Sequence, residues 1–175
     1  LIFDEVITGF GRVGKAFAAQ RFGVTPDLIT CAKGLSNGSV PMGAVLASGK
    51  IHDTFMTGPE GAIELFHGYT YSGHPLACAA ALATLDIFKA DDTLAVNRQK
   101  AAKIGATLAP LADHPQVRHL RQRGMIAAFD VATDDPHFSR KLYRAALKRE
   151  ALIRPIGNTV YLMPPYIVSD EEIEH

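Results

Sequence analysis

Two residues of opposite charge each follow an apolar run. Asp4 comes directly after residues 1–3, and Lys33 comes directly after residues 28–32. A lysine at the end of a buried strand loses solvation free energy unless it has a partner or a chemical role. Burial also makes the amine of a lysine more nucleophilic, which is the condition for a Schiff base with a carbonyl compound. By position alone, Lys33 fits a surface lysine in a strand-to-loop turn better.

The carboxylate of Asp4 could likewise have either a chemical or a structural role. A carboxylate at the end of a buried strand needs a cationic partner, and a protonated pyridine nitrogen is one such partner. That pairing would keep the ring positively charged, so that the ring could accept electrons from a carbanion. Taken alone, Asp4 fits a helix N-cap or a structural ion pair better. The segments around the two residues are therefore decisive.

The segments that hold both residues match one family. Residues 1–14 (LIFDEVITGFGRVG) and 22–34 (FGVTPDLITCAKG) resemble the aspartate- and lysine-bearing segments of class III aminotransferases, which are pyridoxal phosphate (PLP) enzymes. The resemblance implies that Lys33 holds PLP as a Schiff base and acts as the general base. It further implies that Asp4 pairs with the pyridine nitrogen and that Val6 lies against one face of the ring. The resemblance runs along the whole chain.

A third segment, residues 66–75 (FHGYTYSGHP), resembles the loop that this family inserts into the active site of the partner subunit. The resemblance implies that the Thr70 hydroxyl contacts the cofactor phosphate. It also implies a homodimer whose active sites are shared between subunits. Hydroxyl and loop amide groups are suitable phosphate donors. The alternative for Thr70 is a hydroxyl that only stabilises a turn.

Three residues are predicted on the substrate side. Arg154 lies between apolar residues, and its planar guanidinium can grip a carboxylate with two hydrogen bonds. The resemblance supports this role, because family members use an arginine here, whereas the alternative is a salt bridge at a domain junction. Tyr161 and Arg12 are the other two predictions, although Arg12 fits a structural contact with a carboxylate better.

The resemblance implies amino transfer and leaves the substrates open. Residues 33–38, 41–45 and 66–71 look most like ω-amino acid:pyruvate aminotransferases, which favours an ω-amino acid or amine as donor and a keto acid such as pyruvate as acceptor. Residues 153–166 look more like the diaminopelargonate aminotransferases of biotin synthesis, whose amino donor is S-adenosylmethionine. That group commonly has a proline where this chain has Tyr69, so we favour the first interpretation. A catalytically inert fragment or homologue is the third alternative.

The elements that position these residues fall into two parts. Apolar runs at residues 1–3, 28–32 and 41–47, separated by helical connections, predict a sheet that is covered on both faces. The resemblance implies an α/β fold whose sheet is mostly parallel, with helices on both faces. The resemblance implies that residues 1–91 are part of the PLP-binding large domain of fold type I. An apolar helix at 75–89 is predicted to be buried all round.

The second part is predicted to be a small, truncated C-terminal α+β domain at residues 92–175. It would hold strands at 124–131, 152–154 and 159–162, amphipathic helices around residue 104 and after residue 135, and a helix that begins with a capping box at 169–172.

Composition narrows the functional classes. The 175 residues include 18 basic and 18 acidic side chains, so no net field attracts nucleic acid or an anionic membrane. No apolar run is long enough to span a bilayer, and the seven histidines show no zinc-ligand spacing, so we predict no metal. The two cysteines predict buried free thiols and a cytoplasmic location. The chain does not begin with Met, and we predict a fragment that lacks the N-terminal part of its protein.

Overall fold

The computed structural model describes residues 1–61, 65 and 67–175, which divide into two compact units, Leu1–Thr93 (unit 1) and Leu94–His175 (unit 2). Each unit is described by itself. The division lies close to the predicted domain boundary after residue 91, while the assignment of the two parts to the large and small domains of an aminotransferase stays a prediction. The loop predicted at residues 66–75 begins with Phe66, which lies outside the described residues.

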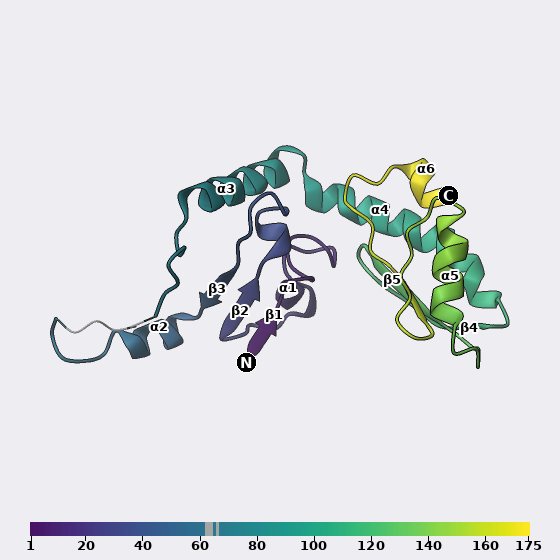
Figure 1. The fold of residues 1–175 in the computed structure, drawn as a ribbon. Helices are drawn as coiled ribbons and strands as arrows, with labels where there is room; N and C mark the ends of the chain where they lie inside the picture. The colour runs from purple at the N-terminus through teal and green to yellow at the C-terminus, as the bar shows by residue number, and fades with distance from the viewer. Residues whose placement is uncertain (62–64, 66) are drawn as a thin grey trace. The chain divides into compact units, whose positions relative to one another are not determined.

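Unit 1 contains a three-stranded sheet in the order β1-β2-β3 (Figure 1). Strand β1 (Ile2–Asp4) pairs in parallel with β2 (Leu28–Cys31), and β2 pairs antiparallel with β3 (Ala44–Ala47). The sheet of this chain is therefore mixed, whereas the sequence predicted mostly parallel strands. The physical reason is that the connection between β2 and β3 holds a 3-10 turn and no crossover α-helix, which usually joins two parallel strands.

The described residues of unit 1 also form the helical segments α1 (Ala18–Phe22), the 3-10 turn η1 (Lys33–Leu35), α2 (Gly49–Phe55) and α3 (Pro75–Ala90). The predicted helix beginning at Pro75 is confirmed, and the ring of His74 accepts a hydrogen bond from its first turn.

The prediction that α3 is buried all round is wrong for this chain. Its buried residues are Ala77, Ala81 and Thr84, whereas Leu76 is 70% exposed and Leu82 is 63% exposed. Among the described residues of unit 1, the contacts of α3 are confined to one face of the helix, so the large side chains on its other faces stay in solvent.

Unit 2 is built on an antiparallel sheet in the order β4-β5-β6, which agrees with the predicted α+β pattern. The structure also has the capping box, because Ser169 and Glu172 exchange hydrogen bonds at the start of α6. The elements of unit 2 are β4 (Val117–Arg123), β5 (Ile126–Val131), β6 (Thr159–Leu162), α4 (Thr93–Leu108, whose first residue belongs to unit 1), the 3-10 helix η2 (Ala109–Asp113), α5 (Phe138–Leu147) and α6 (Asp170–Glu174).

One strand predicted in unit 2 was wrong, and one observed strand was not predicted. The strand predicted at residues 152–154 is absent, because the pairing before β6 is reduced to an isolated bridge between Ile156 and Thr159. Strand β4 was not predicted, because its sequence VRHLRQR is mostly polar. It is an edge strand of the sheet, and charged side chains are typical of such strands because they discourage pairing with another chain.

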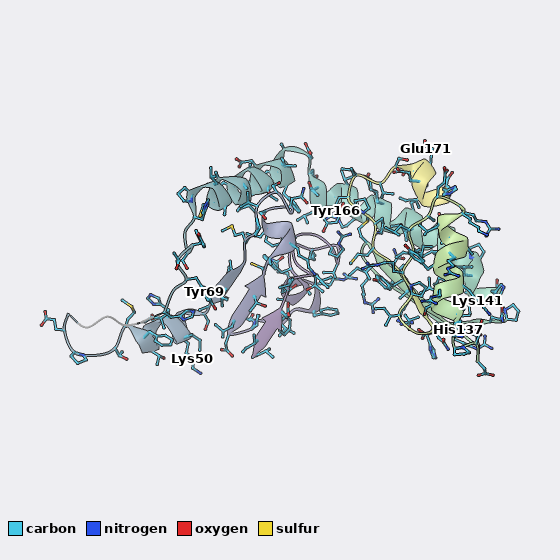
Figure 2. All side chains as sticks on the ribbon, viewed as in Figure 1. Lys50, Tyr69, His137, Lys141, Tyr166 and Glu171 are labelled. Carbon is cyan, nitrogen blue, oxygen red and sulfur yellow. The ribbon has the colours of Figure 1, made fainter. Side chains whose placement is uncertain are left out.

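The core of unit 2 lies between α4, the sheet and the C-terminal segment. Ile104, Met125, Ala127 and Val168 form a buried cluster. The amine of Lys100 donates to the carbonyl oxygen of Tyr166, a residue labelled in Figure 2. Lys103 lies 3.3 Å from Asp170 and 2.6 Å from Glu174, so ion pairs fasten α4 to α6.

Both cysteines of the chain are free thiols, as predicted. Cys31 is buried, and burial raises the pKa of its thiol, whereas Cys78 on α3 is only half-buried. Among the helices of the described residues, none has both the length and the apolar character needed to cross a bilayer.

Candidate active site

The candidate site of unit 1 lies at one edge of its sheet, where β1 and β2 end. Asp4 is the last residue of β1 and stands opposite Thr30 of β2 in the parallel register. Lys33 begins η1, two positions after β2 ends at Cys31. Because parallel strands point the same way, both residues lie at the carboxyl-terminal edge of the strand pair, where open α/β sheets bind ligands.

The carboxylate of Asp4 shapes the chain that follows it. Its Oδ1 accepts a hydrogen bond of 3.0 Å from the backbone amide of Val6, so the strand ends in a local turn. The Asp4 side chain is exposed and that of Val6 is half-buried, whereas the sequence predicted a buried carboxylate. Within unit 1, the described residues leave Asp4 open to solvent.

Lys33 has an unusual backbone conformation, with a φ of 44°. Non-glycine residues rarely adopt this left-handed conformation, and such strain clusters at functional sites. Lys33 is exposed among the described residues of unit 1, as its position after the strand alone favoured, whereas the Schiff-base interpretation started from a buried lysine. Its amine makes no hydrogen bond or ion pair with the described residues.

Glu5 is a residue of this region that the sequence did not single out. It is fully buried, and its carboxylate accepts hydrogen bonds from the Thr8 hydroxyl (2.5 Å) and from the amides of Ala18 (2.9 Å) and Ala19 (2.7 Å). These bonds attach the start of α1 to the residue after Asp4. The partners lie up to fourteen positions away along the chain, so no local pattern could have revealed them.

Two further predicted residues lie elsewhere in unit 1. Thr70 is exposed in a turn that is closed by hydrogen bonds between Tyr69 and Ser72. Figure 2 shows Tyr69 on the segment between α2 and α3. Arg12 is half-buried in the turn region that follows Gly9 and Phe10. These positions leave the predicted roles of Thr70 and Arg12 as predictions.

Unit 2 contains a cleft with a volume of about 750 Å³. Arg154 and Tyr161 both line it, so the structure brings together two of the three residues predicted on the substrate side. Apolar residues such as Leu152 and Val168 form much of the wall. Arg154 is exposed and forms no ion pair with the described residues of unit 2, while the alternative of a salt bridge at a domain junction stays a prediction.

Comparison with known proteins places the chain among transaminases. The family model "Aminotransferase class-III" matches residues 1–175. An omega-aminotransferase of Caulobacter vibrioides is 47% identical over 99% of this chain and 40% of its own length. An adenosylmethionine-8-amino-7-oxononanoate aminotransferase of Synechococcus elongatus is 41% identical over 99% of this chain and 41% of its own length.

A solved structure gives the same likeness. An amine transaminase from an uncultivated Pseudomonas species, in its PLP-bound form, superposes with a TM-score of 0.89 at 38% identity, over 99% of this chain and 41% of that chain. This chain thus spans about 40% of the length of the proteins that it matches.

Proposed function

We propose that the protein containing this chain transfers amino groups with PLP, because the chain belongs to the class III aminotransferase family. The proposed reaction moves an amino group from an ω-amino acid or amine to a keto acid such as pyruvate. The observation that carries the proposal is the placement of Asp4 and Lys33 at the same edge of the sheet. This edge lies within a match to the family that covers the entire chain.

The residues at this edge fit PLP by their chemistry. Lys33 offers an amine that no described residue occupies, and Asp4 offers a carboxylate whose Oδ1 alone is engaged, by a backbone amide. PLP, when bound, supplies an electron-accepting ring that stabilises negative charge on the carbon bearing the amino group. An amine and a carboxylate are the two groups needed to hold such a ring at its aldehyde and at its nitrogen.

Each residue then has a defined task. Lys33 Nζ would hold the cofactor at its aldehyde carbon, whose oxygen would leave as water. Once the substrate amine has displaced it, the Lys33 amine would move a proton between the two carbons that exchange it. Asp4 would hold the proton on the ring nitrogen through charge pairing. Val6, half-buried beside Asp4, would pack against one face of the ring.

We extend the proposal to the assembly. Thr70 would donate its hydroxyl to the cofactor phosphate in the site of a partner subunit, so the active unit would be a homodimer. The exposure of the side chains around Thr70 supports this, because Tyr69 is 78% exposed and Tyr71 is 79% exposed. Exposed aromatic side chains are enriched at protein interfaces. Residues 1–91 would form part of the large domain of fold type I, and residues 92–175 part of the small domain.

We assign the substrate carboxylate to Arg154. Its guanidinium has no acid partner among the described residues, and it shares an apolar-walled cleft with Tyr161. A bidentate pair with a carboxylate would satisfy this charge. Arg12 is a further substrate-side residue in the proposal. The two free cysteines support a reducing compartment, for which we propose the cytoplasm.

A second candidate function keeps the same chemistry with another donor. The 41% identity with the Synechococcus elongatus enzyme supports a diaminopelargonate aminotransferase that takes its amino group from S-adenosylmethionine. The 47% identity with the Caulobacter vibrioides omega-aminotransferase favours the first candidate. A catalytically inert protein is the remaining alternative.

The test uses the full-length protein incubated with PLP. We expect a visible absorption band from cofactor bound to Lys33, and we expect β-alanine to bleach the band while S-adenosylmethionine leaves it unchanged. Lys33→Ala should remove the band and lower amino transfer by roughly 10²–10⁴-fold or more. Lys50→Ala, at an exposed lysine of α2 labelled in Figure 2, is the matched control. It should keep both the absorption band and the rate of amino transfer.

The outcomes separate the alternatives. Bleaching by S-adenosylmethionine and not by β-alanine would establish the second candidate. A wild-type protein that forms no band and transfers no amino group would support the inert alternative. A band that survives Lys33→Ala would overturn the role of Lys33.

A further inference from the structure

We propose that the contact between Phe10 and Gly34 is a positioning device that holds Lys33 in its left-handed backbone conformation and thereby sets where its amine can reach. The inference rests on the proposed function, because it concerns how the bond between Lys33 and the cofactor forms. It makes Phe10 and Gly34 positioning residues, acting through Lys33.

The first observation is the closeness of Gly34 to Phe10. A β-carbon at position 34 would lie 2.8 Å from Cβ of Phe10 and 3.1 Å from both Cγ and Cδ2 of its ring. Real β-carbons essentially never approach another heavy atom to 2.8 Å, so any larger residue would push the two segments apart. The φ of Gly34 lies outside the left-handed region, so glycine is needed here for space and not for backbone freedom.

The second observation is that Phe10 cannot easily give way. It is only 8% exposed, and its own φ of 57° fixes an uncommon backbone conformation. Its ring packs edge to face against Phe17, at 5.4 Å between centroids, and against Phe88 of α3, at 6.5 Å. Edge-to-face aromatic pairs are favourable and directional, so three elements of unit 1 hold the ring in place.

The third observation is that the backbone on the other side of Lys33 is also fixed. Strand β2, which ends at Cys31, is paired on both sides, with β1 and with β3. The amide of Leu35 then donates to the carbonyl oxygen of Ala32 at 3.0 Å and closes η1 around Lys33. Lys33 thus lies between a paired strand and a glycine packed on Phe10, which leaves its backbone little freedom to relax from a φ of 44°.

These observations have a chemical consequence. A strained conformation persists only where its surroundings enforce it, and enforced geometry keeps a reacting group in place without further ordering. Displacing Gly34 would release the backbone of Lys33, and its amine would then sample positions from which it cannot bond the cofactor. The expected defect is therefore in the formation of that bond more than in the folding of unit 1.

The experiment compares Gly34→Ala with Gly49→Ala in the full-length protein. Gly49 begins α2, and a β-carbon there meets no atom within 4 Å, so this variant is the matched control. Each protein is mixed with PLP and reduced with borohydride at set times, and the modified Lys33 peptide is quantified by mass spectrometry. The melting temperature of each cofactor-free protein is recorded in parallel. We expect Lys33 in Gly34→Ala to react at least tenfold more slowly than wild type, with melting within a few degrees, while Gly49→Ala matches wild type.

A second variant covers the case in which Gly34→Ala does not fold. Phe10→Leu keeps an apolar side chain and its β-carbon but removes the ring that packs on Gly34, Phe17 and Phe88. We expect slower modification of Lys33 in this variant, by roughly threefold or more, in the fraction that remains folded. Wild-type modification rates in both folded variants, or a loss of melting temperature with unchanged rates, would overturn the positioning role. A wild-type protein whose Lys33 is never modified would instead overturn the proposed function.

Discussion

Unit 2 buries large side chains around one cluster, whereas most of what unit 1 buries is small. In unit 2, Met125 has no exposed surface, and Ile104 and Val160 are almost as well covered. In unit 1, the buried apolar residues include four alanines, and many of its leucine, isoleucine and valine side chains are exposed. Unit 2 therefore buries larger apolar side chains than unit 1 does. Buried apolar area is the main source of folding free energy.

Specific contacts take the place of a broad core in unit 1. The carboxylate of Glu5 ties α1 to the end of β1, and the ring of Phe10 joins Phe17, Phe88 and Gly34. The candidate chemistry lies beside these contacts, in the unit with the less extensive core. Its exposed apolar side chains, such as Val45 on β3 and Leu76 on α3, are of the kind that mark association surfaces.

The largest effect should follow from removing the centre of the core of unit 2. Met125→Ala deletes a fully buried side chain from the cluster with Ile104, Ala127 and Val168, and we expect the free energy of unfolding of unit 2 to fall by roughly 2–5 kcal/mol. Chemical denaturation, monitored by hydrogen exchange of the β5 amides, would measure this loss of stability. Met125→Leu, which conserves volume, should cost less than about 1.5 kcal/mol. Equal effects of the two substitutions would contradict a packed core.

A polar substitution should be the most damaging one in unit 1. Glu5→Ala leaves the amides of Ala18 and Ala19 and the hydroxyl of Thr8 without their acceptor in a buried place, and we expect a loss of about 2–3 kcal/mol. Hydrogen exchange of the α1 amides would report the loss locally. Glu60→Ala, at an exposed glutamate, is the control and should stay within about 0.5 kcal/mol of wild type. If Glu5→Ala behaved like the control, unit 1 would not depend on this contact.

The sequence predicted those features of the fold that depend on neighbouring residues. The helix beginning at Pro75, the strand that became β6 and the capping box at Ser169 all follow from local preferences, and the structure has all three. The mixed pairing of β1, β2 and β3 did not follow, because strand direction depends on how the connecting segments pack. Strand β4 was missed because its charged side chains conceal an edge strand.

The candidate site shows the same division. Asp4 and Lys33 were found because each follows an apolar run and both match a family pattern. The sequence did not single out Glu5, Phe10 or Gly34. Their importance arises from contacts between segments that are distant along the chain. The exposure of Asp4 and of α3 was also misjudged. An apolar run indicates which side chains tend to be buried, but not whether residues of this chain bury them.

The smallest effect should come from a polar cluster on the sheet of unit 2. Hydrogen bonds from the Thr159 hydroxyl (2.8 Å), from Arg121 (3.2 Å) and from His119 (3.0 Å) lower the pKa of Asp130 from 3.8 to about 2. A lowered pKa means that folding favours the ionised form of the Asp130 carboxyl group over its protonated form. The resulting stabilisation is fully present above pH 4 and is lost as the pH falls toward 2.

Asp130→Asn should therefore lower the melting temperature of unit 2 slightly at pH 7, and the difference from wild type should shrink steadily between pH 4 and pH 2.5. Asp134→Asn, at an exposed neighbour, is the control and should show no such dependence. Because Asp130 is in contact with solvent, added salt should also reduce the difference at pH 7. If Asp130→Asn destabilised unit 2 at pH 7 as strongly as Glu5→Ala is expected to destabilise unit 1, both units would depend on a polar contact for stability. The contrast between the two units would then fail.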